Sequence, residues 1–459
     1  MVHKINEHAS KVLSKSESER IPQEFQRQHA QYEDLTADLK NKSVDFSKQF
    51  CYIYAVRLAE LREILISQVV AKWGDIRILK LAELEDFEGQ ECVIIGTLYK
   101  HQKSKPSILQ ELSEDHQLTL LEPKPNYCSE KDQLFLEDEM LRIKLMVDIA
   151  DLKNYVTGVV CAVLGYKEKD GTFAIKEWCF PGCIPRSLLV SPQSKGKLVF
   201  LSGLDLASSF ENLSLNLLTE WICGMAGDAT MQEDATCIIR VIIAGNSVKT
   251  VTKTNTLIGH AEGKAQVTAI TKEVAAATKR VDAFLIEIAK CCCITLMPGQ
   301  HDPTNAMLPQ MPLHSCVIPQ TSRYRSFKGA TNPWIGKVAE RLIMGSSGQP
   351  IEDIAKATGA TDISSLEWLE RTLLWRHMCP TAPDTLPVHP YFERDPFIIN
   401  HCPDIYFVGN TAKFETKLWK GEGDQIVRLI CIPQFSSTHT AVTVDIESLE
   451  TKSVCFGTG

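Results

Sequence analysis

The sequence predicts a protein of the α/β plus β class, with a helix and a small β-barrel followed by a larger domain of buried strands and helices. Three observations carry this prediction. A helical pattern occupies residues 46–73, four short β-like segments follow between residues 91 and 180, and fully apolar runs alternate with helical patterns after residue 196. Strands that are apolar on both faces are typical of a sheet that is covered on both sides.

Length and composition fit that organisation. The chain has 459 residues, of which 44% are hydrophobic and 23% are charged, which suits a globular protein of two or three domains. Its first 20 residues contain no apolar stretch of signal-peptide length, and no run approaches the roughly 18 apolar residues of a membrane span. We therefore expect a soluble intracellular protein that does not associate with a membrane.

The sixteen cysteines are scattered along the chain and form no C-x-x-C pair. The closest are Cys179 with Cys183, and the triplet from Cys291 to Cys293, which we expect inside a buried strand. Zinc sites usually need two close cysteine pairs, whereas free cysteine behaves as a small buried hydrophobe. We expect reduced thiols, no metal and no other cofactor.

The charge balance bears on nucleic acid as a partner. The chain carries 49 basic and 57 acidic residues, a net charge of −8, whereas proteins that bind nucleic acid unaided usually show a concentrated basic face. The most basic segment spreads six cations over a polar loop and a helix: Lys249, Lys253, Lys264, Lys272, Lys279 and Arg280. We expect a solvated surface there, and no direct tight binding of DNA.

The first helix follows a polar N-terminal extension, residues 1–42, that we expect to be loosely attached. Apolar residues then recur at spacings of mostly three to five, and Gly74 follows as a stop signal. This spacing predicts an amphipathic helix with the apolar stripe in a core. The stripe contains Phe46, Phe50, Ile53, Val56, Leu61, Ile64 and Val69.

Four β-like segments come next, at residues 91–100, 142–149, 157–168 and 171–180. Lys169-Asp170-Gly171 between the last two fits a hairpin turn. Several short strands after a helix suit a small closed barrel, and an OB-type barrel is one option. Such barrels can bind single strands through aromatic residues on a basic face. The segment LEDEMLRIK (136–144) is acidic and aromatic residues are few, which favours a structural or protein-binding barrel.

The second domain contains four apolar runs that end in glycine, at residues 197–203, 237–245, 293–299 and 404–409, with helical patterns at 212–224 and 271–290. Ligands of α/β sheets gather beyond the carboxyl ends of the strands. We therefore expect the four strand ends to face one site in a buried sheet.

The strand ends read Ser202-Gly203-Leu204-Asp205, Gly245-Asn246-Ser247, Gly299-Gln300-His301-Asp302 and Gly409-Asn410-Thr411-Ala412. This pattern resembles the calcineurin-like metallophosphoesterase superfamily, whose strand ends carry D-x-H, G-D, G-N-H-[D/E] and G-H-x-H. In that superfamily two divalent cations, held by carboxylates and imidazoles, activate water for phosphoester hydrolysis.

The metal-binding positions of that superfamily are mostly replaced in this chain. The carried-over positions are Gly203, Asp205, Asn246, Gln300, His301, Asn410 and Ala412, and only His301 and the adjacent Asp302 match the motifs. Two cations beside so few anionic groups would be uncompensated in a cleft. We expect a vestigial site with no bound metal and no catalytic residue. His301 and Asp302 would cap the local turn, and a single weak cation on Asp205, His301 and Asp302 is the alternative.

Further segments narrow the resemblance, because they occur together and in order: residues 298–314 (PGQHDPTNAMLPQMPLH), 377–391 (HMCPTAPDTLPVHPY), 395–410 (DPFIINHCPDIYFVGN) and 425–449. They resemble the B subunits of replicative DNA polymerases, and among these the group that serves DNA polymerase delta, over about residues 43–456. The resemblance implies a helix plus OB-fold domain at 43–190. It also implies an inactive phosphoesterase-like domain at 196–459, a β-sandwich with flanking helices.

The resemblance also implies a function. A B subunit is a non-catalytic nuclear scaffold in DNA replication and repair, joining the cysteine-rich C-terminal domain of the catalytic subunit to a third accessory subunit. The same subunit is shared with the translesion polymerase zeta, and DNA is reached only through the complex. The alternatives are a metal-dependent phosphoesterase or nuclease with altered ligands, and a single-strand binder that works through the barrel.

Two features of the second domain leave their roles open. Four tryptophans beside polar stretches are either interface anchors or ordinary core residues: Trp334, Trp368, Trp375 and Trp419. The proline-rich segment 380–397 is too long for a simple turn and predicts an ordered surface loop. That loop would frame either the vestigial cleft or a partner surface.

Overall fold

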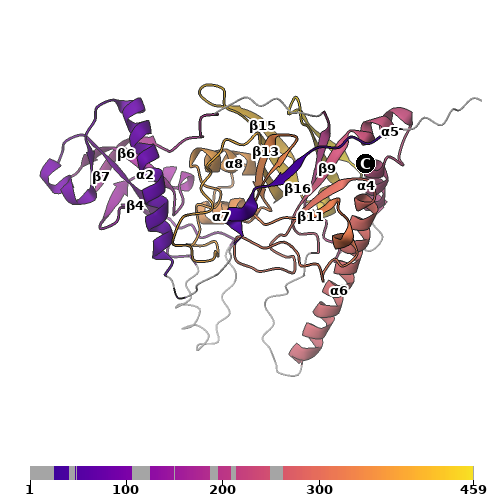
Figure 1. The fold of residues 1–459 in the computed structure, drawn as a ribbon. Helices are drawn as coiled ribbons and strands as arrows, with labels where there is room; N and C mark the ends of the chain where they lie inside the picture. The colour runs from indigo at the N-terminus through magenta and orange to yellow at the C-terminus, as the bar shows by residue number, and fades with distance from the viewer. Residues whose placement is uncertain are drawn as a thin grey trace, which may run out of the picture.

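The computed structural model describes residues 25–40, 47, 49–105, 125–148, 150–186, 195–207, 213–248 and 262–457. Three six-stranded sheets organise this part of the chain. One sheet forms a barrel at one end of the molecule, and the other two pack against each other in the larger domain (Figure 1). The predicted α/β plus β class is confirmed.

The helix α2, Cys51–Trp73, stands between the barrel and the larger domain (Figure 1). The predicted helix is confirmed, and Gly74 ends it with a φ of 73°. Phe50 is 44% exposed just before the helix, so it is not part of the core stripe. Phe46 lies outside the described residues. The buried face includes Arg57, which an apolar pattern does not mark; its residues are Ile53, Arg57, Leu58, Leu61, Leu65 and Val69.

The barrel is closed by strand pairing. Its strands are β2 Ile78–Leu79, β3 Cys92–His101, β4 Gln133–Glu137, β5 Arg142–Met146, β6 Val160–Lys167 and β7 Phe173–Cys179. The order is β2-β3-β4-β5-β7-β6, and an additional β3–β6 pairing completes the ring. At the predicted hairpin the Gly171 N–H donates to the Glu168 carbonyl at 3.1 Å. The sequence did not reveal β4, whose five residues QLFLE adjoin the acidic run. The short helices η2 Leu81–Phe87 and η3 Asp151–Asn154 connect the strands.

The first sheet of the larger domain contains three of the predicted strand ends. Its order is β11-β10-β9-β8-β17-β18, and β8, β9 and β10 run parallel. The strands are β8 Lys197–Leu201, β9 Ile238–Ala244, β10 Cys293–Met297, β11 Phe327–Gly329, β17 Thr440–Asp445 and β18 Thr451–Cys455. Helices α4 Leu213–Cys223 and α6 Glu262–Ala289 cover its outer face, and α5 Ala229–Thr236 leads into β9.

The fourth predicted strand end lies in the second sheet, so the expectation of one sheet was wrong. The order there is β1-β12-β13-β14-β16-β15. Its strands are β1 Tyr32–Asp34, β12 Trp334–Val338, β13 Arg341–Ser346, β14 Ile405–Thr411, β15 Glu415–Lys420 and β16 Ile426–Pro433. A sandwich also buries both faces of its strands, one against the other sheet and one against helices. An apolar run therefore does not distinguish one covered sheet from two.

The core between the two sheets includes Phe200, Ile242, Trp334, Ile343 and Phe407. Helices α7 Gln349–Thr358 and α8 Ser365–Leu374 cover the outer face of the second sheet. Shorter helices are η1 Thr36–Leu39, η4 Thr321–Arg323 and α9 Phe435–Thr438.

One hydrophobic cluster continues from the barrel into the larger domain. It includes Ile94 and Leu136 of the barrel together with Trp368, Trp375 and Tyr406 of the larger domain. Trp334, Trp368 and Trp375 are each at most 3% exposed, and Trp419 packs partly buried against the cluster. These tryptophans are therefore core residues, and the interface-anchor reading is wrong for the three buried ones.

The N-terminal segment is attached over residues 25–40, contrary to the expectation of a loose extension. Strand β1 pairs antiparallel with β12, with Tyr32 opposite Val338, and it crosses the larger domain as an indigo strand in Figure 1. The guanidinium of Arg27 donates to the Ile222 and Ile238 carbonyls at 2.5 and 2.9 Å. An edge strand held by backbone hydrogen bonds needs no apolar pattern, which is why a polar sequence hid it.

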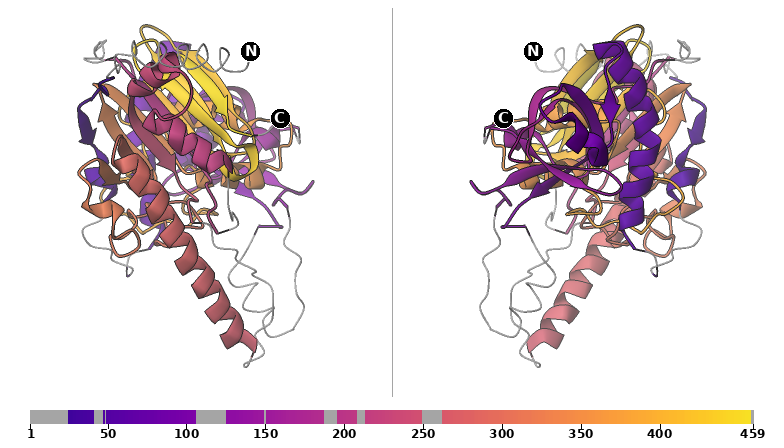
Figure 2. Two further views of the ribbon diagram at one scale, coloured as in Figure 1. Left: turned by 90° about the vertical axis from the view of Figure 1, so that its right-hand side faces the viewer. Right: turned by 90° about the vertical axis from the view of Figure 1, so that its left-hand side faces the viewer.

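The helix α6 begins nine residues before the predicted start and extends beyond the body of the domain (Figure 2). Its C-terminal part packs on the first sheet through Ala277, Val281, Leu285 and Ile288. The basic segment expected at 249–280 falls partly outside the described residues. No helix in the described ranges has both the length and the apolar character that crossing a membrane requires.

Candidate functional site

A polar cavity of about 190 Å³ lies where the carboxyl ends of the strands meet. It is lined by residues from both sheets of the sandwich: Gly203, Asn246, Gln300, His301, Ser347, Gln349, Glu352, Asn410, Gln434 and Ser436. The ends of β8, β9, β10 and β14 therefore converge on one space, although β14 belongs to the second sheet.

Two of the seven predicted positions lie outside this cavity lining. Asp205 is 4% exposed, and its backbone N–H donates to the Asn246 carbonyl at 3.1 Å. Ala412 lines a separate pocket of about 330 Å³ beside the start of α8, together with Ser364 and Lys413. The structure thus brings five of the predicted positions together around the cavity.

Asp302 is buried beneath the turn that follows β10. One carboxylate oxygen accepts the Val248 N–H and the other accepts the Gly299 N–H, each at 2.8 Å. Burial raises the pKa of Asp302, although these hydrogen bonds oppose the shift. Both oxygens hold neighbouring strand ends in place, which favours the capping role over the single-cation alternative.

Asn410 ties the two sheets together at the cavity. Its side-chain Nδ2 donates to the Ala244 carbonyl at 3.0 Å, at the end of β9. The same nitrogen donates to the Ser347 carbonyl at 2.8 Å, just beyond β13. The side chain that stands where the superfamily motif has a histidine is therefore a structural link between strand ends.

A network of amide side chains continues from the cavity wall. Asn332 Nδ2 donates to Gln310 Oε1 at 2.8 Å and to Gln349 Oε1 at 2.9 Å. Asn332 Oδ1 accepts the Ser347 N–H at 2.9 Å, and Asn246 Oδ1 accepts the His301 N–H at 3.1 Å. The polar groups at this site largely bind one another.

Sequence reasoning missed the contribution of β13. The run RLIMG is followed by Ser346, Ser347 and Gly348, and the cavity is lined by Ser347 together with Gln349 and Glu352 at the start of α7. The signal was present, because an apolar run that ends in glycine and small polar residues is the pattern of the other strand ends.

The lining residues do not fit a pair of divalent cations. Such cations need several anionic or imidazole ligands, and one carboxylate must bridge them. The one carboxylate among the lining residues is Glu352, and it pairs with Lys356 at 2.8 Å. Within the described residues, no group of three or more His, Cys, Asp or Glu side chains is arranged to hold a metal ion.

The backbone around the cavity adopts conformations that most residues avoid. The φ angles of Asp205, Asn246 and Asn410 are 48°, 54° and 59°, and that of Gly203 is 59°. Residues in this left-handed region cost energy and cluster at functional sites. A Cβ added at Gly203 would come within 2.7 Å of Asn410 Oδ1, so Asn410 occupies space that an aspartate at 203 would need.

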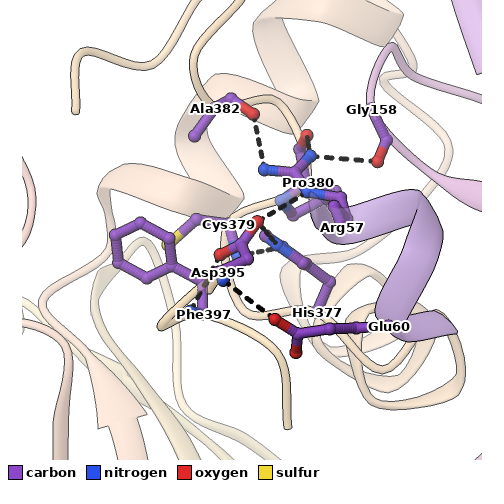
Figure 3. A network of polar contacts seen from close by, with 9 residues as sticks. All are labelled: Arg57, Glu60, Gly158, His377, Cys379, Pro380, Ala382, Asp395 and Phe397. Atoms are coloured by element: carbon purple, nitrogen blue, oxygen red, sulfur yellow. Dashed lines mark hydrogen bonds and ion pairs between the residues drawn. The ribbon is translucent and has the colours of Figure 1, made fainter. Parts of the chain in front are cut away.

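A second polar site, between α2 and the larger domain, is shown in Figure 3. Arg57 Nε donates to Asp395 Oδ2 at 2.7 Å, and both side chains are fully buried. The two terminal nitrogens of Arg57 donate to the carbonyls of Gly158, Pro380 and Ala382 at 2.8–3.0 Å. One side chain thus connects the helix, the barrel and the proline-rich segment of the larger domain. We call this group the Arg57 joint.

His377 completes the Arg57 joint. Its Nδ1 accepts the Cys379 N–H at 3.1 Å, so the ring proton is on Nε2, which lies 3.0 Å from Asp395 Oδ2. Burial and the charge of Arg57 lower the pKa of His377 to about 4. Burial opposes ionisation of Asp395, but Arg57 and His377 hold its pKa far below the usual range. The joint therefore contains one buried cation, one buried anion and a neutral imidazole.

A further contact between the domains lies at the end of α7. Lys100 of the barrel donates from Nζ to the Leu152 and Ala357 carbonyls at 3.0 and 3.4 Å, and Gln102 donates to Ala357 at 3.0 Å. A cation beside the last carbonyls of a helix is favourable. Since α7 begins at the cavity and ends against the barrel, it connects the cavity with the barrel.

The proline-rich segment 380–397 contains no regular helix or strand and is exposed at Pro387 and over residues 392–394, but much of the rest is buried. Thr381, Ala382, Leu386, Val388 and Phe397 are buried. Ala382, Leu386, Val388 and Phe397 belong to the hydrophobic cluster shared by the barrel and the larger domain, and Arg57 of α2 binds the carbonyls of Pro380 and Ala382.

Two family models match this chain over consecutive ranges. Residues 49–178 match the OB-fold domain of the DNA polymerase delta subunit. Residues 198–416 match the B-subunit family of DNA polymerases alpha and epsilon. The first match covers α2 and nearly all of the barrel, which confirms the OB-type prediction, and the second covers most of the sandwich.

Curated relatives are similar over almost the full length. A Drosophila melanogaster protein named DNA polymerase delta subunit 2 is 37% identical over 94% of this chain and 98% of its own length. The DNA polymerase delta small subunit of Arabidopsis thaliana is 38% identical over 96% and 98%. The protein of that name from Oryza sativa is 37% identical over 95% and 99%.

Proposed function

This chain belongs to the family of DNA polymerase delta small subunits, and on that premise we propose that it is a non-catalytic scaffold of the polymerase complex. It is an accessory subunit of that complex, acting in DNA replication. Its proposed partners are the cysteine-rich C-terminal domain of the catalytic subunit and a third accessory subunit, within the nucleus. The catalytic subunit of polymerase zeta is a further proposed partner through the same type of interaction.

The observation that carries the non-catalytic assignment is the small number of anionic groups in the lining of the strand-end cavity, where Glu352 is the one carboxylate. The superfamily that the sandwich resembles would place carboxylates and imidazoles there, whereas this chain has amides and hydroxyls that bind backbone groups. We propose that residues 196–459 form a degenerate calcineurin-like phosphoesterase domain. Residues 43–190 would form the helix and OB-fold domain. Of the proposed 1–42 extension, residues 25–40 add a strand to the sandwich.

The junction between the domains supports the scaffold role. A shared hydrophobic cluster and the Arg57 joint hold the barrel against the sandwich. Partners that bind different faces of such a body would keep a fixed relative position. This rigidity favours binding, because no binding free energy is lost in ordering a flexible hinge between the barrel and the sandwich when a partner docks.

The partner assignment is tested by co-expression of the full-length chain with the polymerase catalytic subunit. We expect the two to co-purify, and we expect a catalytic subunit that lacks its cysteine-rich C-terminal domain to be lost from the complex. A matched catalytic subunit with an N-terminal truncation serves as the control. The scaffold assignment would be contradicted if neither the full catalytic subunit nor the N-terminally truncated control co-purified with the chain.

The enzyme alternative has one observation in its favour, the unusual backbone retained at Asp205, Asn246 and Asn410. It is tested with purified full-length protein, Mn²⁺ and a chromogenic phosphodiester. We expect no turnover above that of the His301→Ala variant. Turnover that His301→Ala abolishes would establish a metal-dependent phosphoesterase.

A further inference from the structure

Two cysteine thiols from distant parts of the sequence meet at the edge of the sandwich. Cys223 ends α4 and Cys291 follows α6, 68 residues later, and their Sγ atoms lie 3.2 Å apart. A disulfide bond is about 2.05 Å long, so the two sulfur atoms need to approach by only about 1.2 Å. Both side chains are partly exposed, which gives a small oxidant access to them.

The two thiols share one hydrogen bond and the charge of one cation. That hydrogen bond is the largest influence on the pKa of each thiol, while burial acts to raise both pKa values and the charge of Arg27 acts to lower both. A thiolate beside a cation is the reactive form of cysteine, so this environment favours attack on an oxidant by a sulfur atom of the pair.

Arg27 is fixed at this place by the backbone rather than by the thiols. It donates to the carbonyls of Ile222, next to Cys223, and of Ile238 at the start of β9. The charge near the sulfur atoms therefore depends on the attachment of the N-terminal segment to the sandwich.

Other cysteines of the chain differ from Cys223 and Cys291 in burial or in the distance between their sulfur atoms. Cys292 is 3% exposed, and burial raises its pKa to about 12. It packs into the core beneath α6, so it is protected from oxidants. A second thiol pair, Cys183 and Cys402, is farther apart, with 3.7 Å between the sulfur atoms.

We propose that Cys223 and Cys291 are a modification site that forms a reversible disulfide under peroxide. The thiolate of one cysteine attacks one oxygen of hydrogen peroxide, the O–O bond breaks, and the departing hydroxide takes a proton to leave as water. The resulting sulfenic acid is attacked by the sulfur of the other cysteine, which loses its proton, so that an S–S bond forms, the S–O bond breaks and a second water leaves. Two thiols are oxidised and one peroxide is reduced to two waters. A small thiol or dithiol reductant reverses the step by exchange.

The modification would join the end of α4 to the residues that lead into β10. It would also remove the thiolate charge beside Arg27, next to the point where the N-terminal segment is anchored.

The test treats the full-length chain, alone and within the assembled polymerase complex, with hydrogen peroxide, followed by alkylation and peptide mass spectrometry. We expect a Cys223–Cys291 linked peptide that disappears on treatment with dithiothreitol. Cys292→Ser and Cys183→Ser are matched controls that should leave the yield of this peptide unchanged. Absence of the linked peptide in both preparations, while the Cys183–Cys402 pair oxidises, would overturn the proposal.

Two single variants test whether the reaction needs both sulfur atoms. Cys223→Ser and Cys291→Ser should each abolish the linked peptide and stop the reaction at a sulfenic acid on the remaining cysteine, which dimedone traps. Cys223→Ala and Cys291→Ala repeat both measurements without a new hydroxyl. Absence of dimedone labelling at positions 223 and 291 in all four variants would overturn the proposed sulfenic acid route.

Discussion

The strand-end cavity and the Arg57 joint are both polar sites inside the same protein, but they differ in charge. The cavity is lined mainly by amides and hydroxyls, whereas the joint buries a guanidinium, a carboxylate and an imidazole away from water. In the calcineurin-like pattern the charge would lie in the cavity, where it would bind metals. Here buried charge is found where the two domains meet. This difference supports the proposed scaffold role, because the buried charge lies where the two domains are joined.

The strongest test of this comparison is Arg57→Met. The substitution leaves Asp395 buried without its cation and removes the donor of three carbonyls, so we expect the free energy of unfolding to fall by about 3–5 kcal/mol. Urea denaturation measures it. The matched control is Arg62→Met on the same helix, whose partner Glu139 is half-exposed, with an expected change below about 1 kcal/mol. Similar losses for both variants would contradict a special role for the Arg57 joint.

The second test uses pH. His377 is neutral in the folded protein with a pKa of about 4, below its ordinary value of about 6.5, so the unfolded chain binds the proton first as the pH falls. The stability that the neutral ring contributes is complete above pH 6.5 and is lost as the pH falls towards 4. Between pH 7 and 4.5 we expect the wild type to lose about 2–3 kcal/mol from this group.

His377→Gln keeps a donor for Asp395 but cannot titrate, and it should be less sensitive to pH over that range. Asp395, whose pKa is lowered, contributes stability above about pH 3.9 and loses it only at lower pH, so the two effects are separable. Equal pH dependence of wild type and His377→Gln in urea denaturation would contradict this account.

The third test asks whether the cavity side chains stabilise the fold. Asn410→Gly tolerates the positive φ but leaves the carbonyls of Ala244 and Ser347 without their donor, so we expect a loss of about 2–3 kcal/mol in the free energy of unfolding. The control is His439→Gly, at another residue of positive φ (51°), with an expected change within about 1 kcal/mol. A neutral Asn410→Gly would show that the amide is not a structural link.

The smallest expected effect concerns metal. With a dissociation constant of about 1 mM or weaker, adding about 1 mM Mn²⁺ should stabilise the folded protein by no more than about 0.4 kcal/mol. Differential scanning calorimetry with and without Mn²⁺ measures it, and Mg²⁺ is the comparison ion. A stabilisation above about 1 kcal/mol that His301→Ala removes would give the cavity a metal and would break the contrast with the Arg57 joint.

Part of the candidate site could be predicted from the sequence. The glycine-terminated runs located four strand ends, and Gly203, Asn246, Gln300, His301 and Asn410 do line one cavity. The contribution of Ser347 was missed, although the run before it ends in glycine and small polar residues, as other strand ends at the cavity do. The position of Ala412 was not predictable, since a single residue beyond β14 turns from the cavity to the pocket at α8.

The sequence by itself determined the helices α2, α4 and part of α6, the four strands whose ends meet at the cavity, the barrel hairpin and the family, because each depends on local spacing or on an ordered set of short segments. The tertiary structure alone decided how those pieces share charge and hydrogen bonds. Arg57 and Asp395 are 338 residues apart, and neither has a local pattern that points to the other. The same holds for the pairing of β1 with β12 and for the contact of Cys223 with Cys291. A buried charge or an edge strand is stabilised by a partner that only folding brings near, and for that reason spacing along the chain could not reveal them.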